Sequence, residues 1–139
     1  MVRSLALAAA FFLGSACAPV AAPGGPRQAD CPILASSDWT AWVNAMPGPG
    51  ARPTLIVTGN VTVPTGGYAT RMGPGPTLRS EPPIQHVLLD VTPPSGAATQ
   101  AVMTLQARGE FPALPSYGRI TVVCGNRILA EIAPVERAF

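Results

Sequence analysis

Prolines and glycines interrupt this chain too often for long helices to form. The 139 residues include 17 prolines and 14 glycines. Proline lacks the backbone N–H and its ring clashes with the preceding helical turn, whereas glycine favours turns. This punctuation predicts a set of short β-strands joined by turns, in a chain long enough for one folded domain.

The segment TLIVTGNVTV, residues 54–63, has the clearest strand pattern. Apolar and polar residues alternate along it, which predicts one buried face made of Leu55, Val57, Val61 and Val63. Gly59 within this strand is expected to mark a β-bulge. Further strands are expected at residues 68–72, 84–91 and 100–108, the first of these ending before the GPGP segment that follows Met72. In the last of these strands, Ala101, Met103, Leu105 and Ala107 are expected to face inward.

The C-terminal part of the chain predicts a β-hairpin. The segments YGRITVVC and RILAEI are separated only by Gly125 and Asn126, a linker suited to a tight turn. Their apolar faces are expected to be Ile120, Val122 and Cys124 on one strand, and Ile128, Ala130 and Ile132 on the other. Six or seven such strands predict an all-β fold, an antiparallel β-sandwich of immunoglobulin-like type.

One segment predicts a short N-terminal helix. Apolar residues follow helical spacing at Trp39, Trp42, Val43 and Met46. Ser36 or Ser37 can cap the start of this helix, and Pro47 ends it. We expect the two tryptophans to pack against the sheet. The alternative is an exposed aromatic patch that binds a partner.

The N-terminal residues 1–16 have the layout of a secretory signal peptide, because Arg3 precedes an apolar run from Leu5 to Leu13. The following LGSAC resembles a bacterial lipobox and predicts lipidation of Cys17, although Gly14 stands where that pattern has a large aliphatic residue. Cleavage at a later small-x-small site, which gives a soluble exported form, is the alternative. Residues 17–30 are expected to be a flexible tether, and residues 31–139 one domain on a periplasm-facing outer-membrane lipoprotein.

The cysteines support export. If Cys17 is lipidated or removed, Cys31 and Cys124 remain, and an oxidising compartment favours a disulfide between them. A metal site would need more ligands than two cysteines and one histidine provide. In the chain-entropy model, a bridge that closes so long a loop stabilises the fold by about 4–5 kcal/mol.

Residues that carry chemistry are scarce. The net charge is only +2 and no basic run occurs, which argues against nucleic-acid binding. His86 is the single histidine and is expected to be a solvated strand residue rather than a general base or metal ligand. A copper site that combines it with Met72 and Met103 has no recognisable spacing. No serine lies in a glycine-flanked elbow, and we expect a protein that is not an enzyme and has no cofactor or metal.

Three short motifs resemble the PrcB-like domain family. They are the TGGY element at Thr65–Tyr68, the turn with Pro93, Pro94 and Gly96, and the TQA segment at Thr99–Ala101. The likeness covers roughly residues 55–110. It implies an exported bacterial lipoprotein associated with a protease complex.

A weaker likeness is to chagasin-like protease inhibitors, whose sandwich loops enter a protease cleft. The resemblances and the loop chemistry together predict a partner-binding site at Pro64, Thr65, Gly66, Gly67, Tyr68, Pro94, Gly96 and Tyr117. Tyr117 is included because LPSY at residues 114–117 is loosely similar to the third loop of these inhibitors. Glycines let a backbone approach its partner closely, and an adjacent aromatic ring can anchor the contact. The alternative for Gly66 and Gly67 is a plain turn. The alternative function is a structural envelope protein that contacts neighbours through its tryptophans or an edge strand.

Overall fold

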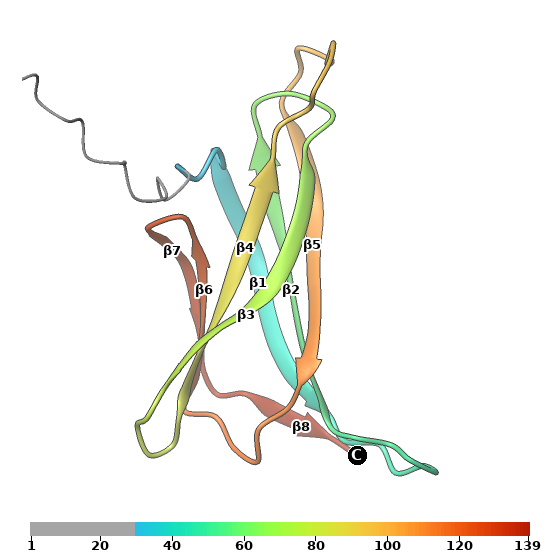
Figure 1. Ribbon diagram of the computed structural model, residues 1–139, viewed down its shortest axis with the longest axis vertical. Helices are drawn as coiled ribbons and strands as arrows, with labels where there is room; N and C mark the ends of the chain where they lie inside the picture. Colours follow the sequence, from blue (N-terminus) through green and yellow to red (C-terminus); the bar gives the residue numbers. More distant parts are fainter. Residues whose placement is uncertain (1–29) are drawn as a thin grey trace, which may run out of the picture.

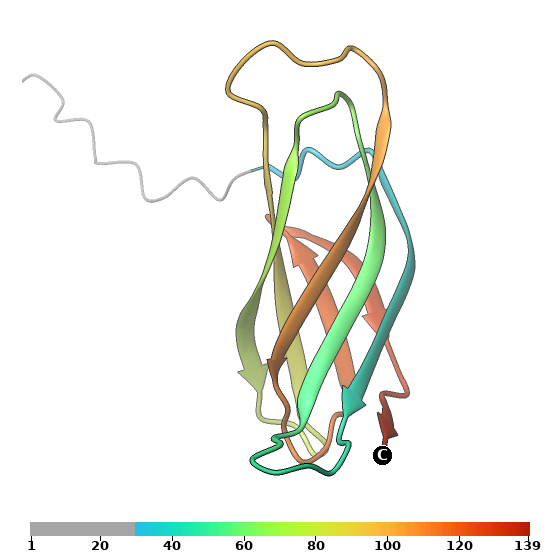
Figure 2. The ribbon, with the colours of Figure 1, turned by 90° about the vertical axis from the view of Figure 1, so that its right-hand side faces the viewer.

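In the computed structural model, residues 30–139 form two four-stranded β-sheets in a β-sandwich-like arrangement (Figures 1 and 2). The strands of this region are β1 (Ala35–Asn44), β2 (Thr54–Val63), β3 (Ala69–Leu78), β4 (Ile84–Thr92), β5 (Met103–Pro112), β6 (Arg119–Cys124), β7 (Arg127–Ile132) and β8 (Glu136–Ala138). The all-β prediction is confirmed, with eight strands in place of six or seven. The predicted signal peptide, Cys17 and all of the tether before Asp30 lie outside the described residues.

Both sheets are mixed, so the prediction of a purely antiparallel sandwich was wrong. The first sheet has the strand order β5-β2-β1-β8 and the second has β3-β4-β6-β7. The chain leaves the second sheet after β4, builds β5 in the first sheet and returns as β6. This return places β6 beside β4 in the same direction, and β8 joins β1 in parallel in the same way.

The predicted N-terminal helix is also wrong, because its residues form β1. Asp38 has a positive φ of 55°, and the register with β2 shifts between Ser37 and Thr40. This bulge turns Trp39 toward the core, where Val43 also lies, whereas Trp42 pairs with Ile56 on the outer face. The helical spacing is therefore a coincidence between residues on two faces of a bulged strand.

The strand β3 continues through the GPGP segment where the sequence predicted a break. Prolines are tolerated here because β3 is an edge strand of the second sheet. Its register with β4 shifts between Pro74 and Thr77. The side chain of Gln85 stabilises this irregular part by donating a hydrogen bond to the Gly75 carbonyl oxygen at 2.9 Å.

The core lies between the two sheets. Most of the residues that the sequence predicted to face inward are buried there. Its fully buried side chains are Leu55, Val57, Val61, Val63, Val87, Leu89, Ile120, Val122 and Val43. The predicted disulfide between Cys31 and Cys124 is present and joins the segment before β1 to the end of β6. The predicted inward position of Ile128 was wrong. A register shift after Val122 pairs this residue with Val123, and its side chain is 61% exposed.

Along β5, the observed strand starts and ends later than the predicted one. Leu105 and Ala107 face the core as predicted, whereas Ala101 and Met103 are exposed. Gly109 lies where β5 meets β3 across the sandwich, since a Cβ atom there would come within 2.7 Å of the Met72 Cβ. Across residues 30–139, no helix has the length and apolar character needed to cross a membrane.

Candidate functional site: two loops without charged residues

Two loops lie together at one end of the molecule, the upper end in Figures 1 and 2. Residues 64–68 connect β2 to β3, and residues 93–102 connect β4 to β5. The strands β2 and β4 both run toward this end, so the loops that follow them emerge side by side. This end therefore holds seven of the eight residues that the sequence predicted as partner-binding.

Direct contacts join the two loops into one unit. The backbone N–H of Gly66 donates a hydrogen bond to the Thr99 carbonyl oxygen at 2.9 Å. A Cβ atom on Gly66 would lie 3.1 Å from the Met103 Sδ, and one on Gly67 would lie 2.9 Å from the Pro94 Cβ. Gly67 also has a φ of 80°, a conformation that favours glycine. The two glycines thus shape the turn and also allow the neighbouring loop to pack against it.

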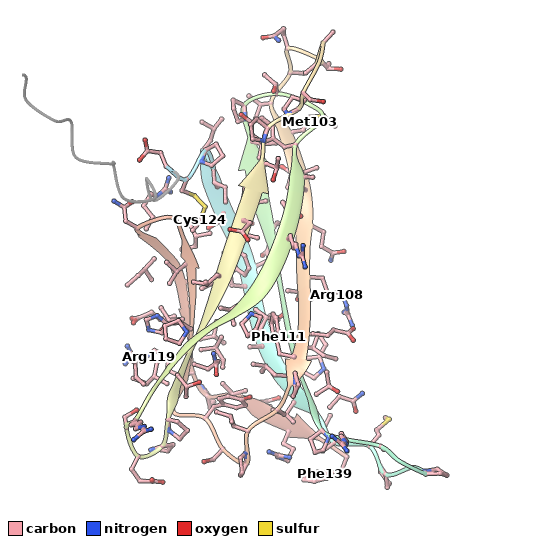
Figure 3. The ribbon with its side chains drawn as sticks, in the orientation of Figure 1. Met103, Arg108, Phe111, Arg119, Cys124 and Phe139 are labelled. Carbon is pink, nitrogen blue, oxygen red and sulfur yellow. A yellow bond between two sulfur atoms is a disulfide. The ribbon has the colours of Figure 1, made fainter. Side chains whose placement is uncertain are left out.

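The surface of this two-loop unit is formed by small polar and apolar groups. Its exposed residues are Gly67, Pro93, Ser95, Gly96, Ala97, Thr99, Gln100, Ala101, Val102 and Met103. Val102 is 63% exposed and Met103 is 43% exposed, and Figure 3 shows Met103 at this end. Tyr68 is partly exposed, so its ring is available only in part to a partner.

The chain around both loops carries no charge. Residues 53–70 and 91–107 contain no aspartate, glutamate, lysine, arginine or histidine. Arg71 and Asp90 border these stretches and face each other across β3 and β4. A partner that contacts only these two loops removes no charged side chain from water, a step that costs much free energy unless the charge is paired. Such a surface also provides little electrostatic steering.

Tyr117 lies at the opposite end, in the 113–118 loop between β5 and β6 (Figure 1). Its hydroxyl oxygen accepts a hydrogen bond from the Leu114 backbone N–H at 2.8 Å, and its ring packs against the core. Burial raises the pKa of Tyr117 above its usual value, while the Leu114 bond and the Arg137 charge partly oppose this rise. Tyr117 is therefore separated from the other seven candidate residues.

Tyr117 also lines a small, mostly apolar cavity of about 290 Å³ between the sheets. Part of its wall is formed by Phe111, Val87 and Leu55, and Figure 3 shows Phe111 toward the C-terminal end of β5. The polar side chain of Gln85 borders it, but its amide is already bonded to Thr77 and to two backbone oxygens. Tyr117 thus packs against the lower end of the core as part of the wall of this cavity.

The residues considered for chemistry do not converge. His86 lies on β4 in register with Thr121, while Met72 approaches Gly109 and Met103 lies beside Gly66. Within the part of the chain that the structure describes, no three or more histidine, cysteine, aspartate or glutamate side chains gather in a way that could hold a metal ion.

The two tryptophans border the same groove but differ in how they pack. The Trp39 indole packs over Gly59, where a Cβ atom would lie only 2.2 Å from the ring, and its Nε1 is buried with no hydrogen-bond partner. Trp42 lies on the outer face and borders a groove of about 360 Å³ with Pro134 and Glu136. Core packing is thus confirmed for Trp39. Sequence reasoning assigned Gly59 to a bulge in its own strand, but the bulge lies opposite it in β1.

No protein-family model matches this chain, and comparisons with curated proteins and with solved structures give no match. The resemblances to PrcB-like domains and to chagasin-like inhibitors therefore depend on the short motifs alone.

Proposed function

We propose that this protein is a non-enzymatic, exported binding module that stabilises or inhibits a protease, or binds another envelope protein, through its two-loop end. The observation that supports this proposal most is the packing of the 64–68 loop against the 93–102 loop. Loops held in place before binding lose less conformational freedom when the partner arrives. Tyr117 takes no part in this site, since it lies at the other end of the sandwich.

The chemistry of the two-loop end suits a partner surface rich in uncharged backbone. Gly67 and Gly96 allow close approach of the main chain, and the exposed side chains of Val102 and Met103 provide apolar contact. The partly exposed ring of Tyr68 is the aromatic anchor. A sandwich of immunoglobulin-like type would serve here as the rigid scaffold for the loops.

Export is part of the proposal. A disulfide between Cys31 and Cys124 fits an oxidising compartment. The predicted signal peptide and the lipid anchor at Cys17 would hold the domain in the cell envelope, on the periplasmic side of the outer membrane. Mass spectrometry of the mature N-terminus tests the anchor, and a start beyond Cys17 would exclude it.

The partner-binding test compares affinity captures from envelope extract with matched variants. Tyr68→Ala and Val102→Asp alter the two-loop end, and we expect both to lose partners that the unchanged protein retains. Ile128→Asp is the control, because Ile128 is 61% exposed on the outer face of the second sheet and Val102 is 63% exposed. Equal recovery of every partner by all variants contradicts a binding role for this end.

A structural role in the envelope is the second candidate, and the groove beside Trp42 favours it. In that case Trp42→Ala loses envelope contacts while Val102→Asp keeps them. The same captures therefore separate the two functions.

A further inference from the structure

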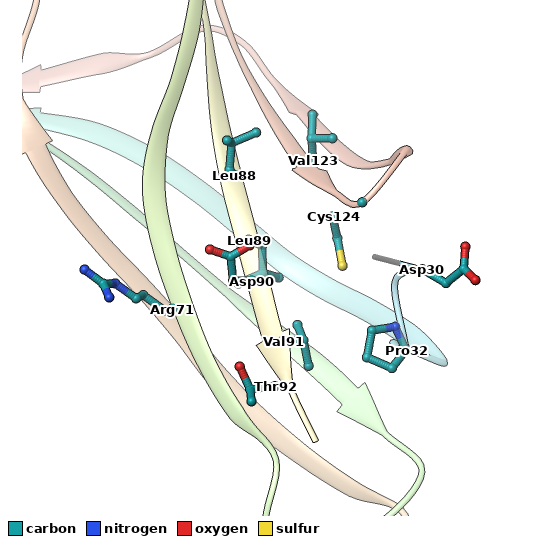
Figure 4. Close-up of a pocket in the computed structure, with 11 residues that line it drawn as sticks. Asp30, Pro32, Arg71, Leu88, Leu89, Asp90, Val91, Thr92, Val123 and Cys124 are labelled. Atoms are coloured by element: carbon teal, nitrogen blue, oxygen red, sulfur yellow. The ribbon is translucent and has the colours of Figure 1, made fainter. Parts of the chain in front are cut away.

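The second sheet has a gap near its upper end. The strand β4 pairs with β6 from Ile84 to Leu88, and the last pair is Leu88 with Val123. On its other side, β4 stays paired with β3 as far as Thr92. Figure 4 shows the gap between the end of β4 and the turn that follows Cys124.

Among residues 30–139, no strand pairs with the main chain of β4 in this gap. Alternate residues of a strand direct their N–H and C=O groups to alternate sides. Of the four residues Leu89–Thr92, two therefore present these groups to the side that β6 has left. In residues 30–139, strand pairing on this side ends at Leu88. Unpaired strand groups of this kind are a template for another chain.

The gap forms a cavity of about 550 Å³. One wall consists of the five consecutive residues Leu88–Thr92, and the other contains Asp30, Pro32 and the end of β6. Figure 4 shows Val91 and the Cys124 sulfur facing the space between the walls. Five consecutive residues of one strand therefore border this space, as they would border a neighbouring strand.

We propose that this gap binds an extended peptide segment of a partner protein, which pairs with β4 as an added strand. An extended chain is the occupant because it alone supplies backbone donors and acceptors at strand spacing. Small aliphatic side chains on the peptide would face Val91 and the disulfide. Outward side chains would lie beside Leu88, which is 40% exposed, and Val123.

Charge favours a basic residue in the peptide. The cavity is bordered by the carboxylates of Asp30 and Asp90 and by one guanidinium, that of Arg71. Both carboxylates belong to exposed residues, so this preference is modest and sensitive to salt. The site does not depend on the two-loop end and remains testable if that end binds nothing.

The test uses the mature protein purified from the cell envelope and the capped peptide acetyl-Val-Lys-Val-Thr-Val-amide at millimolar concentration. Hydrogen–deuterium exchange of fragments that cover β4 reports on the gap. In the free protein, we expect the gap-facing amides of residues 89–92 to exchange faster than those of residues 84–88. The peptide should slow them. Equal protection of both segments without peptide would show that the edge is already covered and overturns the proposal.

Two controls distinguish strand pairing from non-specific binding of the peptide. N-methylation of one alternate set of peptide amides should weaken binding about tenfold or more, the effect expected from lost backbone hydrogen bonds, while the other set is tolerated. In the protein, Val123→Arg should weaken binding, whereas Ile128→Arg on the neighbouring strand should not. The proposal is refuted if neither methylation pattern matters, or if both protein variants behave alike.

Discussion

Gly59 and Trp39 are expected to be strongly coupled in stability. In the variant Gly59→Ala, the new Cβ atom would lie 2.2, 2.3 and 2.6 Å from three carbons of the indole. Carbon atoms in favourable contact are about 3.5–4.0 Å apart, so the ring must move by more than about 1 Å. Because Trp39 packs against the core, we expect this overpacking to lower the free energy of unfolding by about 3 kcal/mol.

The variant Trp39→Ala removes the obstacle and provides the second arm of a double-mutant cycle. Alone, it should cost about 3–5 kcal/mol through lost packing. Part of this cost is offset, because the buried and unpartnered Nε1 disappears as well. In this background Gly59→Ala should cost almost nothing, since alanine suits a strand better than glycine. The expected coupling is therefore about 3 kcal/mol.

The free energy of unfolding is measured for the unchanged protein, the two single variants and the double variant. Urea unfolding is followed by far-ultraviolet circular dichroism, with the disulfide kept oxidised. Gly73→Ala is the matched control, because no atom lies within 4 Å of its new Cβ and Gly73 also lies in a strand. The explanation is refuted if Gly59→Ala lowers the free energy of unfolding equally with and without the Trp39 indole. The cost would then come from the backbone rather than from the ring.

Three further predictions concern the disulfide, the buried tyrosine and the two-loop end. Replacing Cys31 and Cys124 together by serine should lower the free energy of unfolding by up to about 4–5 kcal/mol, which urea midpoints measure, and an unchanged midpoint would argue against the chain-entropy account. Because the folded pKa of Tyr117 is raised, the folded state holds its proton longer, and stability should fall as the pH rises above the unfolded value near 10. Tyr117→Phe should flatten this alkaline decline in melting temperature, and an equally steep decline would contradict it. The affinity of the two-loop end for its partner, measured by titration, should change little between low and high salt. A strong loss of affinity at high salt would indicate a charged binding surface instead.

Much of the sandwich could be predicted from local patterns. The alternation from Leu55 to Val63 predicted β2 because one face of a strand must be buried. The short linker at Gly125 predicted the hairpin, and cysteine counting predicted the disulfide. The helix predicted around Trp39 was wrong because a contact between neighbouring strands determines the local structure. Only the open space over Gly59 on the neighbouring strand accommodates the indole, and this contact is invisible in the spacing of apolar residues.

For the candidate site, the residue types can be taken from the sequence alone: the glycine pair Gly66 and Gly67, and the two stretches without charge. The ends at which the loops lie also follow from the order of the strands. Because the chain reverses direction from each strand to the next between β2 and β5, the loops after β2 and β4 lie at one end and the loop with Tyr117, after β5, lies at the other. Two features depend on the three-dimensional fold: the Gly66–Thr99 hydrogen bond joins the two loops, and β6 separates from β4 after Leu88. Both depend on how segments distant in sequence pack together, and local periodicity carries no record of that packing.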